Sequence, residues 1–171
     1  MSEEEYLSAR ESTLNAHYTS PVIIRGIYRT LQRMGFTKGN LLEPSMGIGN
    51  FFGMLSETMR ESHLYGVELD DLTGRIARQL YPKADITVDG YEKTTFPNDF
   101  FDAAVGNVPF GQYKVADKKY DKYNFLIHDY FFGKTLDQVR PGGVIAFITS
   151  KGTMDKENPC LLYTSDAADE L

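Results

Sequence analysis

The chain has 171 residues, of which 42% are hydrophobic, and its formal net charge at pH 7 is -6. This length suits a single globular domain with a hydrophobic core, and no window approaches the roughly 18 apolar residues of a membrane-spanning helix. The negative charge argues against strong nucleic-acid binding by this chain alone, because phosphate contacts need Lys and Arg. The acidic start Met-Ser-Glu-Glu-Glu is unlike a signal peptide, so a cytoplasmic protein is expected.

Hydrophobic spacing and turn residues predict alternating helices and strands. Helices are expected at residues 3–15, from Pro21 after a Ser20 cap to a Gly35 stop, at residues 50–60, from Asp70 or Asp71 to residue 80, and at residues 124–139. Strands are expected at residues 40–43, 63–68, 85–88, 100–106 and 144–149. This order predicts a mostly parallel sheet with helices on both faces, and such sheets bind ligands at the carboxyl ends of their strands.

A glycine-containing turn follows the first predicted strand. Gly47 and Gly49 allow a tight turn and close backbone approach to a ligand, and the next helix would offer free N–H groups. Glu68 ends the next strand about 20 residues later, which also fits a dinucleotide-binding fingerprint. However, a carboxylate at Glu43 suits the cationic methionine end of S-adenosylmethionine and would repel a pyrophosphate.

A second motif follows the fourth predicted strand. Asn107, Val108, Pro109 and Phe110 come directly after an apolar run, at a strand end. Amino-methyltransferases carry Asn or Asp, two prolines and an aromatic residue at this place, and here Val108 replaces the first proline. Without the other segments, an ordinary loop would explain the motif equally well.

Together these segments resemble the catalytic domain of N6-adenine DNA methyltransferases, most closely the large methylase and helicase polyproteins of phages and mobile elements. The resemblance covers residues 17–156 and implies a Rossmann-like fold dependent on S-adenosylmethionine. It adds a first cofactor motif at residues 17–21, a ribose-binding acid at residues 67–70 and an adenine-edge contact at residues 89–91. The cofactor-binding residues that it implies are Tyr18, Thr19, Glu43, Pro44, Ser45, Gly47, Gly49, Asn50, Phe51, Glu68, Leu69, Asp89, Gly90 and Asn107.

The same resemblance implies methyl transfer to N6 of an adenine flipped out of duplex DNA, as in restriction-modification systems or mobile elements. Asn107 and the Val108 carbonyl would accept the two amine hydrogens, Pro109 completes the motif, and Phe110 would stack on the base. DNA would be held mainly by regions outside this chain, with a helicase domain expected in the full-length protein. No metal site is expected, because His63 and His128 lack metal-ligand spacing.

Three segments are expected along the chain. Residues 1–36 would form helices that carry the first cofactor motif, residues 37–159 an incomplete methyltransferase core that stops after the fifth strand, and residues 160–171 a non-native tail that reads like a translated sequencing adapter. Four lysines follow the catalytic motif and are candidates for phosphate contacts or for a solvated lid: Lys114, Lys118, Lys119 and Lys122.

Three other functions remain open from the sequence. An RNA or protein-glutamine amino-methyltransferase would share the glycine turn and the Asn-Pro-aromatic pattern. A dinucleotide oxidoreductase is disfavoured, because no acid suited to hydride transfer is recognisable. An inactive fragment that serves as a structural piece of a larger protein is also consistent with the sequence.

Overall fold

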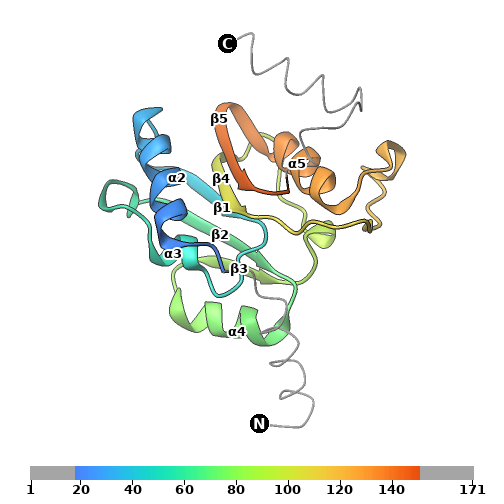
Figure 1. Cartoon of the computed structure of the whole chain (residues 1–171), viewed down its shortest axis with the longest axis horizontal. Coiled ribbons are helices and arrows are strands. Elements are labelled where there is room, and N and C mark those ends of the chain that lie inside the picture. The colour runs from blue at the N-terminus through green and yellow to red at the C-terminus, as the bar shows by residue number, and fades with distance from the viewer. Residues whose placement is uncertain (1–17, 151–171) are drawn as a thin grey trace.

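A five-stranded parallel sheet forms the centre of the protein (Figure 1). The structure is a computed structural model and describes residues 18–150, so the helix predicted at residues 3–15, His17 and the predicted tail lie outside the described residues. The spatial strand order is β3-β2-β1-β4-β5. The bounds are Asn40–Glu43 for β1, His63–Glu68 for β2, Asp85–Val88 for β3, Phe101–Asn107 for β4 and Val139–Ile148 for β5.

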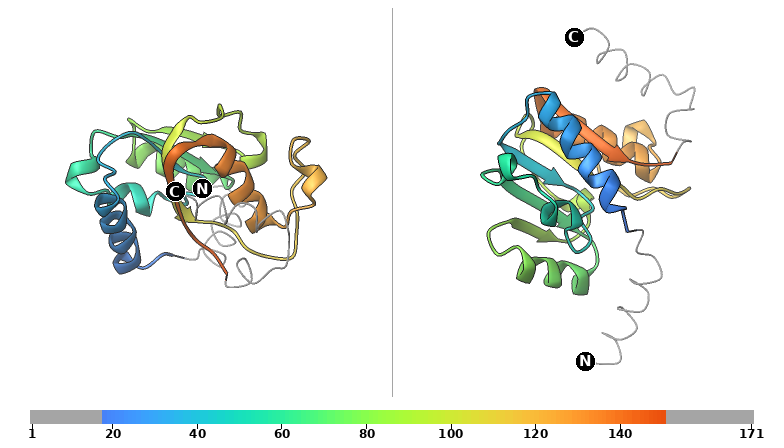
Figure 2. Two further views of the ribbon diagram at one scale, coloured as in Figure 1. Left: turned by 90° about the horizontal axis from the view of Figure 1, so that it is seen from above. Right: turned by 60° about the vertical axis from the view of Figure 1, so that its left-hand side comes forward.

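Helices cover both faces of this sheet, as predicted (Figure 2). The helices are α2 (Pro21–Arg33), α3 (Asn50–Gly53), α4 (Asp71–Leu80) and α5 (Ile127–Gln138). In β1, Leu41 packs with α2 and α3, whereas the next residue, Leu42, packs with α5 on the opposite face. Both side chains are buried because successive residues of a strand point to opposite faces.

Local sequence explains the start and end of α2. The Ser20 side chain caps the helix by accepting a hydrogen bond from the Val22 N–H, and Pro21 occupies the first turn. The chain leaves the helix through Gly35, whose φ of +90° is accessible to glycine at little cost. The buried side of α2 carries Ile24, Tyr28 and Leu31. The predicted domain boundaries at residues 36 and 159 stay predictions.

The helix predicted at residues 50–60 is wrong in its length. Only α3 forms, followed by a short 3-10 turn at Glu57–Met59. Gly53 is a poor helix former, and the Tyr28 hydroxyl donates a hydrogen bond of 2.8 Å to the Phe51 carbonyl, which would be needed in the next helical turn. Phe51 packs in the same hydrophobic cluster as α2, and Phe52 packs in the cluster that includes α4. This short helix therefore contributes to two parts of the core.

The last helix and strand also differ from the prediction. Asn124 adopts a left-handed conformation and α5 begins only at Ile127. Strand β5 begins at Val139, so that Pro141, Gly142 and Gly143 lie inside it, beside a register shift against β4. Gly142, with φ of +77°, supplies the backbone conformation that this irregular strand start needs. Within residues 18–150, no helix has the length and apolar character to cross a bilayer.

Candidate active site

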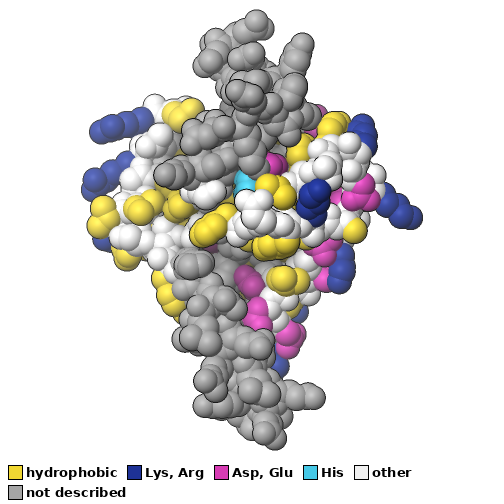
Figure 3. Space-filling view, turned by 45° about the vertical axis from the view of Figure 1, so that its right-hand side comes forward, with side chains coloured by type: hydrophobic (Ala, Val, Ile, Leu, Met, Phe, Trp, Pro, Cys, Tyr) yellow, Lys and Arg dark blue, Asp and Glu magenta, His cyan; other side chains and the backbone are white. Residues whose placement is uncertain are grey.

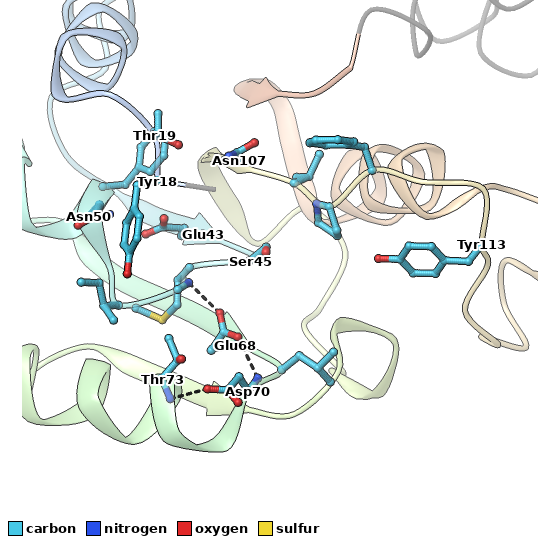
Figure 4. A pocket seen from close by; sticks show the side chains of 18 residues that line it. Tyr18, Thr19, Glu43, Ser45, Asn50, Glu68, Asp70, Thr73, Asn107 and Tyr113 are labelled. Atoms are coloured by element: carbon cyan, nitrogen blue, oxygen red, sulfur yellow. Dashed lines mark hydrogen bonds between the residues drawn. The ribbon is translucent and has the colours of Figure 1, made fainter. Parts of the chain in front are cut away.

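A cavity of about 620 Å³ opens where β1, β2 and β4 end (Figure 4). Its volume lies within the range of small-molecule sites. Thirteen predicted site residues line it: Tyr18, Thr19, Glu43, Ser45, Gly47, Asn50, Phe51, Glu68, Leu69, Asn107, Val108, Pro109 and Phe110. The structure therefore brings the glycine turn, the Glu68 segment and the Asn107 motif, which are distant in sequence, to one cavity.

Glu68 connects two of these segments. Its Oε2 accepts a hydrogen bond from the Gly47 N–H at 2.7 Å, and its Oε1 accepts one from the Asp70 N–H at 2.9 Å. Burial raises the pKa of Glu68, and these N–H donors oppose the rise because they stabilise the charged carboxylate. Each carboxylate oxygen has a second lone pair, so Glu68 can still accept hydrogen bonds from a ligand.

Glu43 is the most deeply buried acid of the cavity. Its side chain is 2% exposed, and its Oε2 has no hydrogen-bond partner among the described residues. Burial, and then repulsion by Glu68, raise the pKa of Glu43 well above its usual range. A buried carboxylate oxygen without a hydrogen-bond partner is unfavourable when the group is charged, so a cationic ligand group would stabilise the charged form of Glu43.

The two glycines of the turn have different surroundings. Both have positive φ, +56° at Gly47 and +83° at Gly49. A Cβ at Gly47 would meet no atom within 4 Å, whereas a Cβ at Gly49 would collide with the ring of Tyr81. The Tyr81 hydroxyl also donates a 2.7 Å hydrogen bond to the Gly49 carbonyl. Gly47 lines the cavity and Gly49 does not, so Gly49 serves the packing of the turn.

The Asn107 motif extends β4 into the cavity. Asn107 is the last residue of β4 and, in Figure 4, lies at the rim above Glu43. Val108 is buried, and its N–H donates a hydrogen bond of 3.1 Å to the Ile148 carbonyl of β5. A proline could not donate this hydrogen bond, so β5 fixes the backbone at the position where the related motif has its first proline. Phe110 is 46% exposed at the cavity.

Four predicted cofactor residues are not part of the cavity lining: Pro44, Gly49, Asp89 and Gly90. Asp89 forms an ion pair of 2.7 Å with Lys93, and the hydrogen bond from this ammonium lowers the pKa of Asp89. Its predicted contact with the adenine of the cofactor stays a prediction. Among the described residues, no group of three or more His, Cys, Asp or Glu side chains could hold a metal ion.

Five lining residues were absent from the predicted site: Met46, Ile48, Asp70, Thr73 and Tyr113. Asp70 was predicted as a helix cap and as part of the ribose-binding segment at residues 67–70, but was not itself named as a cofactor contact. It does cap α4, since its Oδ1 accepts a hydrogen bond from the Thr73 N–H at 2.8 Å. Both residues reach the cavity because α4 begins directly after the end of β2. Tyr113 lies in a polar loop three residues after Phe110, and this closeness to the predicted motif was the available signal.

The four lysines after the motif are partly engaged within the protein. Lys119 forms an ion pair of 2.7 Å with Asp137, and Lys114 donates a hydrogen bond to Asn124. The Lys122 ammonium lies 4.7 Å from the centre of the Tyr123 ring. On the face in Figure 3, the Lys and Arg side chains are scattered, most of them near the periphery, and acidic side chains lie among those on the right. This distribution fits a weak electrostatic attraction to nucleic acid.

Two viral proteins are similar to this chain in sequence. The defense against restriction protein B of Escherichia phage P1 is 31% identical over 152 residues, which cover 85% of this chain and 6% of the phage protein. The type II methyltransferase M.CvrRI of Paramecium bursaria Chlorella virus XZ-6E is 30% identical over 105 residues, which cover 61% of this chain and 27% of the viral protein. The chain thus spans a small part of each. No family model matches it.

Solved structures have the same arrangement of strands and helices. An S-adenosylmethionine-dependent O-methyltransferase from Thermotoga maritima matches with a TM-score of 0.58 and 15% identity, over 82% of this chain and 48% of that chain. This is a methyltransferase fold. A tRNA (m1A58) methyltransferase from Aquifex aeolicus has the same TM-score, 0.58, with 13% identity over 82% of this chain and 51% of that chain. The predicted Rossmann-like, S-adenosylmethionine-dependent methyltransferase fold is confirmed, and the viral relative supports a methyltransferase.

Proposed function

We propose that this domain binds S-adenosylmethionine in the cavity and methylates the exocyclic N6 amine of adenine in DNA. The observation that carries the proposal is the position of Asn107, which shares one cavity with Glu43, Glu68 and the glycine turn. An amide side chain at the end of β4 thus lies beside a site suited to a charged nucleoside ligand.

The cavity fits this cofactor in two respects. The Oε2 of Glu43 has no hydrogen-bond partner among the described residues, so a nearby cation would stabilise the charged carboxylate. S-adenosylmethionine carries two such cations, a sulfonium and an ammonium group. Glu68 has lone pairs left for ribose hydroxyls, since its two oxygens offer more acceptor positions than the backbone N–H groups around them fill. A dinucleotide would instead bring a pyrophosphate towards two acids, which disfavours an oxidoreductase.

Asn107 and its neighbours provide the acceptor side. The adenine amine is a weak nucleophile because its lone pair is delocalised into the ring. Hydrogen bonds from the amine to Asn107 Oδ1 and to the Val108 carbonyl would localise that lone pair and orient it. When bound, S-adenosylmethionine would supply an electrophilic methyl group to the amine nitrogen, with the thioether sulfur as leaving group, and the proton lost by the amine would pass to water. Phe110 offers a ring for stacking.

DNA is favoured over RNA by the sequence relative that is named a type II methyltransferase, whereas the likeness to a tRNA methyltransferase concerns the fold alone. A phage protein named for defence against restriction agrees with a role in DNA modification. Because the chain spans 27% and 6% of these relatives, we propose that other parts of a longer protein hold the duplex. A helicase domain in that protein stays a prediction.

Transfer of a labelled methyl group tests this function. The full-length protein is incubated with methyl-labelled S-adenosylmethionine and, separately, with duplex DNA, RNA and protein acceptors. We expect label in DNA from the wild type and from Asn98→Ala, an exposed asparagine outside the cavity, and none from Asn107→Ala. Label confined to RNA or protein, or equal transfer by Asn107→Ala, would overturn the proposal.

A further inference from the structure

Tyr113 is an exposed aromatic residue that the proposed mechanism does not yet use. It lies in the loop between the Asn107 motif and α5, and 53% of the residue is exposed. In Figure 4 its ring lies across the cavity from Tyr18, with its hydroxyl directed inwards. An exposed ring at the cavity is not explained by core packing, because burial is what stabilises aromatic side chains in a fold.

A hydrogen bond to α5 holds the loop backbone at this residue. The Tyr113 carbonyl accepts a hydrogen bond of 2.9 Å from the N–H of Ile127, the first residue of α5. On the other side, a Cβ at Gly111 would come within 2.8 Å of the Tyr113 ring, so the ring approaches a backbone that only glycine leaves open.

A buried polar cluster anchors the next part of the loop. Asp117 Oδ2 accepts hydrogen bonds from the Tyr130 hydroxyl at 2.7 Å and from the Lys134 ammonium at 3.1 Å. Lys134 is buried and also donates to the carbonyls of Tyr91 and Thr94. Burial alone would raise the pKa of Asp117, but the two donors lower it overall, which keeps the carboxylate charged.

This anchoring has a consequence for binding. A ligand that stacks on a mobile ring must first order it, which costs part of the binding energy. The loop is held by the hydrogen bond from the Ile127 N–H and by the contacts of Asp117. The backbone of Tyr113 is therefore already ordered, and ligand binding has to order little more than the side chain. In Figure 4 the ring lies at the end of the cavity opposite Tyr18 and Asn50, away from Glu43.

We propose that Tyr113 is a second aromatic contact for the acceptor base, in addition to Phe110, and that Asp117, Tyr130 and Lys134 form a latch that positions it. This inference rests on the proposed transfer to DNA. It makes Tyr113 a contact of the acceptor and assigns it no part in binding S-adenosylmethionine. The latch residues act through the loop and do not touch the base.

Steady-state kinetics of the full-length protein test the contact. Tyr113→Ala should raise the KM for DNA about 5- to 150-fold, the range expected for one lost base-aromatic stacking contact. Its affinity for S-adenosylmethionine should not change, and Tyr113→Phe should keep most of the wild-type KM. The matched control is Tyr123→Ala, since Tyr123 lies in the same loop, is 41% exposed and does not line the cavity.

Two results overturn the contact. One is a Tyr113→Ala protein with the same KM for DNA as Tyr123→Ala, and the other is a loss of affinity for S-adenosylmethionine with an unchanged KM for DNA. In both cases the wild type still methylates DNA, so the proposed function stands. A wild type that transfers no methyl group to DNA refutes the proposed function itself, and this contact with it.

A double-mutant cycle tests the latch. Tyr130→Phe removes one hydroxyl from Asp117 and should raise the KM for DNA in the wild-type background. In the Tyr113→Ala background the same change should have little further effect, because the positioned ring is already absent. Independent, additive effects would overturn the latch even if both proteins fold.

Discussion

Glu68 and Gly47 are joined by a hydrogen bond of 2.7 Å between the Glu68 carboxylate and the Gly47 N–H. This bond ties the end of β2 to the turn after β1, and a second bond of 2.9 Å ties the same carboxylate to the Asp70 N–H. Glu68 thereby shapes the cavity before any ligand is bound. The residue predicted to hold the ribose of the cofactor also organises the glycine turn.

Replacing Glu68 should therefore weaken both the fold and cofactor binding. Glu68→Ala removes hydrogen bonds to a charged group, each worth about 1.5–3 kcal/mol, so we expect a lower melting temperature and at least a tenfold loss of affinity for S-adenosylmethionine. Calorimetric titration and thermal unfolding measure the two effects. The control is Glu61→Ala, which removes an exposed ion pair with Lys38. An affinity equal to that of the control would refute the site assignment.

The raised pKa of Glu43 predicts a pH-dependent affinity. The cationic cofactor favours charged Glu43, so binding below the raised pKa must release a proton, and the affinity should fall as the pH falls. Its neighbours Tyr28 and Tyr81 also have raised pKa values, mainly through burial, and are neutral in this range. The pKa of Glu68 is raised as well, so Glu68 both repels the charged form of Glu43 and can contribute to the titration. Calorimetry in buffers of different ionisation enthalpy measures the released protons. Glu43→Gln should release fewer protons; an unchanged number would exclude Glu43 as their source.

The Glu43 carboxyl should also affect the stability of the ligand-free protein. Because the folded-state pKa of Glu43 is raised, its contribution to stability is fully present below the unfolded-state pKa and is lost as the pH rises through the folded-state value. We therefore expect Glu43→Gln to unfold at a higher temperature than the wild type at neutral pH, and the difference to shrink in acid. A difference that is independent of pH would show that the carboxyl does not titrate in this way.

Gly47 and Gly49 should respond differently to the same change. Alanine at either position costs about 1–2 kcal/mol for its left-handed backbone. At Gly49 the new Cβ also collides with the Tyr81 ring, so Gly49→Ala should lower the melting temperature further. At Gly47 it meets open space beside the cavity, so Gly47→Ala should mainly lower the affinity for S-adenosylmethionine. Equal melting temperatures for the two variants would contradict this assignment.

Val108→Pro tests how the protein accommodates its altered motif. The substitution restores the pattern of related proteins but deletes the N–H that binds the Ile148 carbonyl, a hydrogen bond worth about 0.5–1.5 kcal/mol. We expect reduced stability in chemical denaturation. Val108→Ala, which keeps the N–H, serves as the comparison for lost side-chain packing. Wild-type stability of the proline variant would show that the contact to β5 contributes nothing.

The sequence predicted the elements that depend on local signals. Strands β1, β2 and β3 have the predicted bounds, and Ser20 and Asp70 cap helices as expected. The early start of β5 and the late start of α5 depend on a register shift against β4 and on the left-handed Asn124, which are set by tertiary packing.

Some residues of the candidate site could likewise be predicted from local sequence, and others depend on tertiary packing. Residues at strand ends, such as Glu43 and Asn107, could be predicted because parallel strands end at one edge of the sheet. Tyr113 could not, because its loop is held by a hydrogen bond from Tyr130 to Asp117 across 13 positions of the chain. Asp89 was predicted to contact the cofactor, but an ion pair with Lys93, four residues later, engages its carboxylate.

The most direct test of the central claim is the identity of the methylated nucleoside. Duplex DNA treated with the full-length protein and methyl-labelled S-adenosylmethionine is digested to nucleosides, which are separated and identified by mass spectrometry. Positioning of an exocyclic amine by Asn107 predicts that the label is found in N6-methyldeoxyadenosine and disappears with Asn107→Ala. Label in a methylated ring carbon, a ring nitrogen or a sugar would contradict the account.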